Sequence, residues 1–422
     1  MLIQFRVGNF LSFKDPITFS MVASRIKEHE SSNVFLLNKR LKVLKSAVIY
    51  GANASGKSNL FKAMAFMKKF VLTSSQASEQ IKVTNFRLST DTENAPSLFE
   101  IVFVHEGIRY RYGFQVDKKE VRGEWLYYAP KRQEAKLFTR DGTTFEIGSY
   151  YKEGRGLVEK TRNNALFLSI VAQFNGQISL RITDWFKKFN IISGLNDTRY
   201  LGYTIDQVHN DEVRGEILKF LKIADLGIED INIEEEKLNL ETLPKDMPEA
   251  LKAKLLSADQ VLDVKIKSVH KKFDQDKKAS TFEKFEFGRE ESEGTKKLFA
   301  ISAPLLDTIK NGKIMVIDEF DSRLHPTITE FLVRLFNSSE NRKNAQLIFA
   351  CHDTNLIKRD IFRRDQIWFT EKDQYGATDL YSLVEYIMDK GKVRNDASYG
   401  KDYILGKYGA IPFVSNPKLL FK

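Results

Sequence analysis

One octapeptide constrains this chain more than any other part of it. Residues 51–58 read GANASGKS and match the pattern G-x-x-x-x-G-K-[S/T] at every fixed position. The run SAVIY at residues 46–50 precedes it and is typical of a buried parallel strand. After the octapeptide, apolar residues recur on one face of an expected helix, at Leu60, Phe61, Met64, Met67 and Val71. A strand, a glycine-rich turn and an amphipathic helix are the setting in which this pattern binds phosphate.

The residues of the octapeptide, which we call the P-loop (residues 51–58), suit phosphate chemistry. Glycines allow the backbone to wrap so that its N–H groups and the helix N-terminus face an anion. Lys57 is expected to reach the β and γ phosphates of ATP, and the Ser58 hydroxyl is expected to bind Mg²⁺. The nucleotide-binding residues predicted here are Gly51, Asn53, Ser55, Gly56, Lys57, Ser58 and Asn59.

A second motif lies in the C-terminal half of the chain. The apolar run at residues 314–317 ends in Asp318 and Glu319, so a buried strand is expected to carry two carboxylates at its C-terminal edge. Ligands bind at that edge in open α/β sheets. Asp318 suits a contact with Mg²⁺, and Glu319 suits polarising the water that attacks the γ phosphate. The alternative is that two acids simply end a strand.

Two smaller motifs accompany this acidic pair. Ser292 and Gly294 stand between an expected strand and a helix from Thr295, and a small Ser-x-Gly step at a helix N-terminus can bind an anion. His352 follows the apolar run at residues 346–350. A lone histidine after a strand is usually structural, but its place after the other motifs favours a functional role.

Together these segments resemble a known family. FRVGNFLSFKD, GANASGKSNL, VIDEFDSRLHP and CHDTNLI resemble the stand-alone ABC-type ATPases related to the overcoming-lysogenisation-defect proteins, RecF and SMC heads. RRDQIWFTEKD, LYSL and YGKDYILGKYGAIP are most similar to the RloA/AbiLi branch, the ATPases of bacterial abortive-infection systems. The resemblance spans nearly the whole chain and is weakest between residues 190 and 280.

The resemblance implies further roles. Ser292 and Gly294 would reach the γ phosphate bound by the other chain of a homodimer, and His352 would be the switch histidine at the γ phosphate. Gln173, in LSIVAQFN, is the candidate for the glutamine that contacts the metal. The sequence departs from the transporter pattern, since ESEGTKK stands where LSGGQ is usual and Leu-His-Pro replaces Leu-Asp after the acidic pair.

The fold class expected from these motifs is α/β: an ABC-type P-loop ATPase core with an antiparallel β-subdomain and an inserted helical lobe. Residues 1–160 are expected to form the N-terminal part of the core, residues 161–280 the helical lobe, and residues 281–422 the C-terminal part of the core. Alternating apolar residues predict an antiparallel meander over 99–148, and 160–260 are expected to be mainly helical. Further strands are expected at 262–269, 282–287, 314–317, 346–350, 366–370 and 377–383.

Composition narrows the class of protein. The chain has 422 residues and one cysteine, Cys351, which excludes an internal disulfide framework and a cysteine-based zinc site. There is no apolar run of about 18 residues and no signal-peptide pattern at the start, so no membrane contact is expected and the cytoplasm is the expected location. The net charge of +10 fits nucleic-acid contact and equally a lysine-rich solvated surface.

The leading hypothesis is a homodimer, or a higher even oligomer, that hydrolyses ATP as sensor or motor of an anti-phage system. Its effector would be a separate protein, possibly a Toprim- or HNH-type nuclease, because the chain has no second catalytic constellation. Residues 190–260 and 399–412 are the surfaces left to bind that partner. The alternative is a RecF-like DNA-repair ATPase, and a transporter subunit or a P-loop kinase fits less well. Pro244 and Pro248 leave no room for long coiled-coil arms.

Overall fold

The computed structural model describes residues 1–38, 41–76, 80–131, 133–196, 198–237, 262–388 and 391–412. The chain forms two compact units. Unit 1 comprises Met1–Leu195, Asp307–Ser322 and Pro326–Lys422, and unit 2 comprises Asn196–Leu306 with Arg323–His325. These units group residues by compactness, whereas the division at residues 160 and 280 was made from motifs and stays a prediction.

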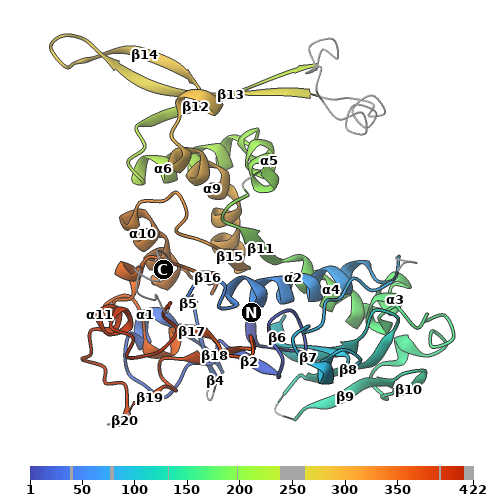
Figure 1. Ribbon diagram of the computed structural model, residues 1–422. Coiled ribbons are helices and arrows are strands. Elements are labelled where there is room, and N and C mark those ends of the chain that lie inside the picture. Colours follow the sequence, from blue (N-terminus) through green and yellow to red (C-terminus); the bar gives the residue numbers. More distant parts are fainter. Residues whose placement is uncertain are drawn as a thin grey trace, which may run out of the picture. The chain divides into compact units, whose positions relative to one another are not determined.

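A six-stranded sheet lies at the centre of unit 1, in the order β11-β15-β16-β5-β17-β18 (Figure 1). Its strands are β5 (Ser46–Gly51), β11 (Phe189–Ser193), β15 (Ile314–Asp318), β16 (Gln346–Ala350), β17 (Ile367–Lys372) and β18 (Thr378–Ser382). All neighbours are parallel except β17 and β18, the two strands expected at residues 366–370 and 377–383, which form an antiparallel hairpin. Every residue of β5 and β16 is buried, which is why both strands read as uninterrupted apolar runs.

A second, seven-stranded sheet is antiparallel and has the order β10-β9-β8-β7-β6-β1-β2. Its strands are β1 (Leu2–Gly8), β2 (Ile17–Ser20), β6 (Ser97–His105), β7 (Ile108–Val116), β8 (Val121–Ala129), β9 (Ala135–Asp141) and β10 (Thr144–Ile147). Five of these strands confirm the meander predicted from alternating residues between 99 and 148. The predicted α/β class with an antiparallel subdomain is therefore confirmed.

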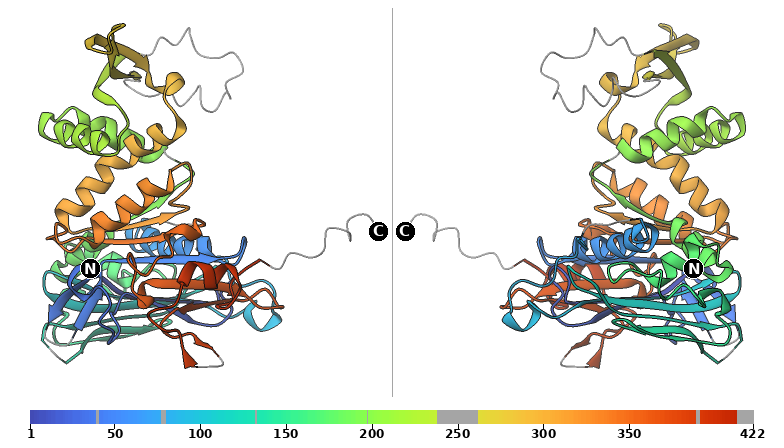
Figure 2. Two further views of the ribbon diagram at one scale, coloured as in Figure 1. Left: turned by 90° about the vertical axis from the view of Figure 1, so that its left-hand side faces the viewer. Right: turned by 90° about the vertical axis from the view of Figure 1, so that its right-hand side faces the viewer.

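Helix α2 (Lys57–Thr73) packs in the core that the two sheets share. Its buried face carries the five apolar residues that the sequence pattern predicted. Phe66 of α2 contacts Phe99 of the antiparallel sheet, with ring centroids 4.8 Å apart. Figures 1 and 2 show α2 and α4 (Gln177–Lys187) lying along one face of the antiparallel sheet. The P-loop thus joins a fully buried strand to a helix that buries one face.

The remaining elements of unit 1 are short. They are α1 (Glu30–Asn33), β3 (Val34–Asn38), β4 (Leu41–Leu44), α3 (Phe167–Gln173), α10 (Pro326–Asn337), β19 (Ile387–Met388), β20 (Gly391–Lys392) and α11 (Tyr399–Ile404). Single turns of 3₁₀ helix lie at Thr90–Thr92, Lys152–Gly154, Thr354–Leu356 and Arg364–Gln366. In the described part of the chain, no helix has the length and hydropathy needed to cross a membrane.

Unit 2 contains α5 (Thr198–Val208), α6 (Asp211–Ile223), α8 (Phe287–Glu290) and a three-stranded antiparallel sheet. The strands are β12 (Ile228–Lys237), β13 (Leu262–Phe273) and β14 (Ala279–Glu286). Helix α9 (Glu293–Asn311) begins in unit 2 and ends in unit 1. The strand pair predicted near residues 262–287 is confirmed as β13 and β14.

The prediction that residues 160–260 are mainly helical is wrong for two segments, β11 and β12. Strand β12 reads IEDINIEEEK, and its acids disfavour a strand when the segment is read alone. Lysines on the partner strand β13 offset these acids, for example through the ion pair of Lys267 with Glu234 at 2.8 Å. The prolines Pro244 and Pro248, used above against coiled-coil arms, lie outside the described residues.

Candidate functional site

The P-loop follows the carboxyl end of β5 and leads into α2. Gly56 caps α2 with φ of 114°, a conformation that side chains rarely adopt, and a Cβ there would lie 2.4 Å from Thr378 Oγ1. Only glycine fits this position. Asn53 is exposed at the tip of the loop, whereas Ser55 is buried beneath it.

Three hydroxyl-bearing residues outside the sequence motif hold the loop in shape. Thr370 on β17 shares a hydrogen bond of 2.6 Å with Ser55 Oγ, and Thr378 on β18 donates to Ser55 O at 2.8 Å. Ser12, in the loop between β1 and β2, accepts a hydrogen bond of 2.8 Å from Asn59 Nδ2. The Ser12 hydroxyl in turn donates to Thr378 Oγ1 at 2.8 Å, since the one hydrogen of the Thr378 hydroxyl goes to Ser55 O. Sequence reasoning assigned no role to Ser12, Thr370 or Thr378, because each is a common residue type. Ser12 and Thr370 lie in segments that carry the resemblance, and that was the only signal for them.

Lys57 is buried, with 6% of its surface exposed. Its Nζ donates to Gly51 O at 2.8 Å and to Ala52 O at 3.1 Å. Burial lowers the pKa of Lys57, and the negative charges of Asp318, Glu319 and Asp321 oppose that shift. Asp318 ends β15, and Glu319 and Asp321 follow it, so these charges act on Lys57 from the end of that strand.

Asp318 and Glu319 stand where β15 ends. Asp318 Oδ1 is buried and has no hydrogen-bond partner among the described residues. Glu319 has a left-handed backbone with φ of 52°, which is uncommon for a residue with a side chain. Gly194, just after β11, donates its N–H to Asp318 O at 2.7 Å, so the end of β11 contacts the backbone of this pair.

The residues after β16, which we call the switch segment (residues 351–353), lie beside the acidic pair. Asp321 Oδ2 accepts hydrogen bonds from the backbone N–H groups of His352 at 3.0 Å and Asp353 at 2.9 Å. The Tyr50 hydroxyl donates to Asp353 O at 3.0 Å. The ring of His352 is exposed, so it is accessible to a ligand.

The order β15-β16-β5 explains how these motifs meet. The three strands are parallel neighbours, so their carboxyl ends lie at one edge of the sheet. Asp318 and Glu319 follow the first strand, His352 the second and the P-loop the third. The structure thus places three of the predicted motifs on one edge.

Gln173 is not brought to this edge. It is the last residue of α3, and α3 is held at the far end of α2 by a hydrogen bond of 2.6 Å from Ser169 Oγ to Val71 O. At about 1.5 Å per residue, α2 places Val71 about 21 Å from Lys57. The interpretation of Gln173 as a metal contact rested on its local sequence alone, and the geometry does not support it.

Ser292 and Gly294 belong to unit 2. The segment follows the short helix α8 rather than the strand directly, which corrects the expected order. Ser292 Oγ accepts a hydrogen bond of 3.1 Å from Thr295 N and so caps the first turn of α9. A Cβ on Gly294 would lie 2.9 Å from Arg323 O, a close approach that favours glycine.

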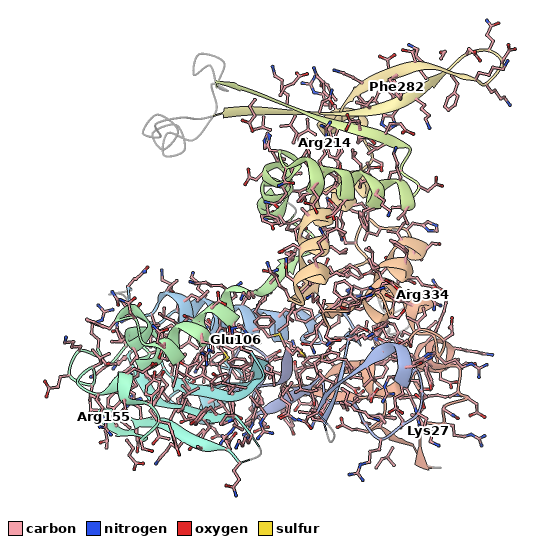
Figure 3. The ribbon with its side chains drawn as sticks, turned by 180° about the vertical axis from the view of Figure 1, so that it is seen from behind. Lys27, Glu106, Arg155, Arg214, Phe282 and Arg334 are labelled. Atoms are coloured by element: carbon pink, nitrogen blue, oxygen red, sulfur yellow. The ribbon has the colours of Figure 1, made fainter. Side chains whose placement is uncertain are left out.

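The sequence has two runs of basic residues, at residues 265–278 and 358–364, and several of their side chains pair with neighbouring acids. On β13, Lys271 pairs with Glu229 at 2.8 Å. Lys358, in the second run, pairs with Glu330 at 2.9 Å. Outside the runs, Arg334 and Arg214, both labelled in Figure 3, pair with Asp360 and Asp230 at 2.7 Å. In these described segments, the basic side chains pair with acidic side chains of the same chain.

Solved structures of other proteins are similar to this chain at low sequence identity. Among curated proteins, none matches this chain in sequence. Similar solved structures include the SMC head domain from Thermotoga maritima, 14% identical over 90% of this chain and 98% of that chain, with a TM-score of 0.41. A SmcHead bound to the C-winged helix domain of ScpA is 14% identical over 90% and 97% of the two chains, with a TM-score of 0.44. The recombination mediator protein RecF-ATP of the RecFOR pathway is 13% identical over 90% and 99%, with a TM-score of 0.36.

A family model also matches the chain, over residues 46–358. That match covers the P-loop, the acidic pair and His352, and it takes in most of the sequence. The chain belongs to the family described as "AAA domain, putative AbiEii toxin, Type IV TA system".

Proposed function

We propose that this chain binds ATP with Mg²⁺ and hydrolyses it to ADP and phosphate. The observation that supports the proposal is the parallel pairing of β15, β16 and β5, whose carboxyl ends carry the acidic pair, His352 and the P-loop at one sheet edge. Phosphoryl transfer needs a cation at the β and γ phosphates and acids that hold the metal and the water. The P-loop supplies the first, and the end of β15 supplies the second.

The residues present fit a magnesium ion. Mg²⁺ takes oxygen ligands, and the unpaired buried Oδ1 of Asp318 is an oxygen whose burial is costly unless something satisfies it. Ser58, next to Lys57 in the first turn of α2, would supply a second oxygen. When bound, the ion neutralises charge on the phosphate oxygens.

Glu319 and His352 would act on the γ phosphate from adjacent strands. The carboxylate of Glu319 would orient the attacking water and accept its proton. His352 would donate a hydrogen bond to the γ phosphate. The left-handed backbone of Glu319 supports a functional role, because strained conformations persist where the surrounding structure holds them.

The active form in this proposal is an ABC-type homodimer. Ser292 and Gly294 at the start of α9 would complete the γ-phosphate site of the second copy. Backbone N–H groups at a helix N-terminus favour an anion, which fits that role.

In the cell, we propose an ATPase of an abortive-infection system of the RloA/AbiLi type, in the cytoplasm, with a separately encoded effector such as a Toprim- or HNH-type nuclease. The family description, which names a putative toxin of a toxin–antitoxin system, supports a role in defence. The RecF-like alternative requires nucleic-acid contact, and the ion pairs of Lys271 and Lys358 within the basic runs give it no added support.

Hydrolysis is tested by measuring phosphate release from Mg-ATP with the wild-type protein and with Glu319→Gln. The wild type is expected to turn over, and the variant is expected to bind ATP and lose turnover at least 100-fold. Asp379→Asn, a change on β18 away from the acidic pair, serves as the control. Equal turnover in the wild type and Glu319→Gln would show that Glu319 is not the base.

The role in defence is tested by expressing this gene and each neighbouring gene separately and together, with and without phage. Protection that needs both genes and an intact Lys57 supports the proposal. DNA-stimulated ATP hydrolysis without any effect on phage would favour the repair alternative instead.

A further inference from the structure

The carboxylate of Asp321 lies three residues after the metal-binding position and contacts neither Lys57 nor the P-loop through any hydrogen bond of the described residues. Its oxygen Oδ2 instead accepts both consecutive backbone N–H groups of His352 and Asp353, at 3.0 and 2.9 Å. Hydrogen bonds to a carboxylate are about twice as strong as neutral ones. One oxygen therefore fixes two successive peptide groups.

The two hydrogen bonds to Asp321 extend the pairing of β15 and β16 beyond the last residues of these strands. The ladder of β15 and β16 stops at the pair Ile317 and Phe349. Beyond it, Phe320 N donates to Ala350 O at 3.0 Å, and the two bonds of Asp321 follow. The backbone that carries Glu319 is thereby tied to the backbone that carries His352.

The switch segment is held from its other side as well. The Tyr50 hydroxyl, at the end of β5, donates to Asp353 O at 3.0 Å. Gly400 of α11 lies so close that a Cβ there would be 2.9 Å from Thr354 O. The segment therefore has fixed neighbours, and Asp321 is the one among them that follows the acidic pair in the chain.

We propose that Asp321 is a positioning residue, which holds His352 in register with Glu319 so that both reach the γ phosphate together. This inference rests on the proposed ATPase function. It assigns Asp321 no contact with nucleotide: the residue acts through the backbone of the switch segment. Loss of its carboxylate should release His352 without removing the P-loop or the acidic pair.

Hydrogen exchange tests the structural part directly. The amides of residues 352 and 353 are expected to exchange at least tenfold faster in Asp321→Ala than in the wild type. Asp321→Asn keeps one acceptor oxygen and should restore part of the protection. Asp117→Ala is the matched control, since Asp117 Oδ1 also accepts two backbone N–H groups, from Lys119 and Glu120, in a turn of the antiparallel sheet.

Kinetics test the functional part. Asp321→Ala is expected to lower kcat at least tenfold with KM for ATP changed less than threefold. In a His352→Ala background the same change should have no further effect on kcat, because Asp321 acts through that residue. Asp117→Ala should leave both constants unchanged.

The outcomes separate the two proposals. If the wild type does not hydrolyse ATP, the proposed function fails, and hydrogen exchange still decides whether Asp321 holds the segment. Unchanged exchange in Asp321→Ala, or losses in kcat that multiply in the double variant, would overturn the role of Asp321. If Asp321→Ala does not fold, Asp321→Asn gives the same comparison with a smaller expected effect.

Discussion

Gly194 offers a sharp test of how the backbone positions Glu319. The residue is buried after β11 and lies against the peptide that joins Asp318 to Glu319. A Cβ added at Gly194 would be 2.2 Å from Glu319 O and 2.6 Å from Asp318 O. Both neighbours are backbone atoms of the acidic pair, so neither can rotate away as a side chain would.

The expected effect of Gly194→Ala follows from these distances. Real Cβ contacts are essentially never shorter than 3.0 Å, so the backbone of Glu319 or of Gly194 must move by about 0.8 Å. Overpacking of this kind costs about 1–3 kcal/mol of stability. A misplacement near 1 Å costs on the order of 100-fold in rate, so kcat should fall about 10- to 100-fold. ATP binding by the P-loop should persist.

The assay pairs urea denaturation with steady-state ATP hydrolysis. Gly202→Ala is the control: it lies in α5 with nothing within 4 Å of the added Cβ. That change should stabilise the protein by about 0.5–1 kcal/mol and leave kcat unaltered. A Gly194→Ala protein with wild-type kcat would refute the view that this backbone contact sets the position of Glu319.

Three further predictions follow from the site and the core. Lys57→Ala should abolish the ATP-dependent rise in melting temperature, which for the wild type corresponds to about 2.7 kcal/mol at 100 times Kd, while the fold in the absence of ATP stays intact by circular dichroism. Mixing Lys57→Ala with Ser292→Ala protein should restore part of the ATPase activity, since one composite site of the mixed dimer is complete; full activity of monomeric Ser292→Ala would contradict the shared site. Burial raises the pKa of Glu124 above its ordinary value of 4.5, so the folded state binds the extra proton and stability should fall as pH rises from 4.5 through the raised pKa. Glu124→Gln should flatten that slope in urea denaturation, and an unchanged slope would show that Glu124 is not its source.

The sequence predicted the local parts of the site because each is written in consecutive residues. The strand of residues 46–50, the P-loop and the first turns of α2 form one uninterrupted pattern. The acidic pair at Asp318 and Glu319 follows a buried run in the same way. Parallel neighbours then bring these segments to one edge, which the order of the motifs allowed us to expect.

Long-range contacts were not predictable in this way. Ser12 and Thr378 meet across the fold, and no spacing in the sequence relates them. For Gln173 the local sequence suggested a metal contact, but the residue belongs to a helix that packs at the end of α2 away from the P-loop. Strand β12 was missed because its acids are offset by lysines on a partner strand further along the chain.

The hydrogen bonds of Thr370 and Thr378 to the P-loop also bear on how the protein is made. The P-loop leaves the ribosome early, whereas the two threonines that close around Ser55 are translated more than three hundred residues later. A nascent chain therefore carries the nucleotide motif long before it has the hairpin that shapes it. Tight ATP binding should appear only once β17 and β18 have emerged, so incomplete chains would remain unable to enter the nucleotide cycle.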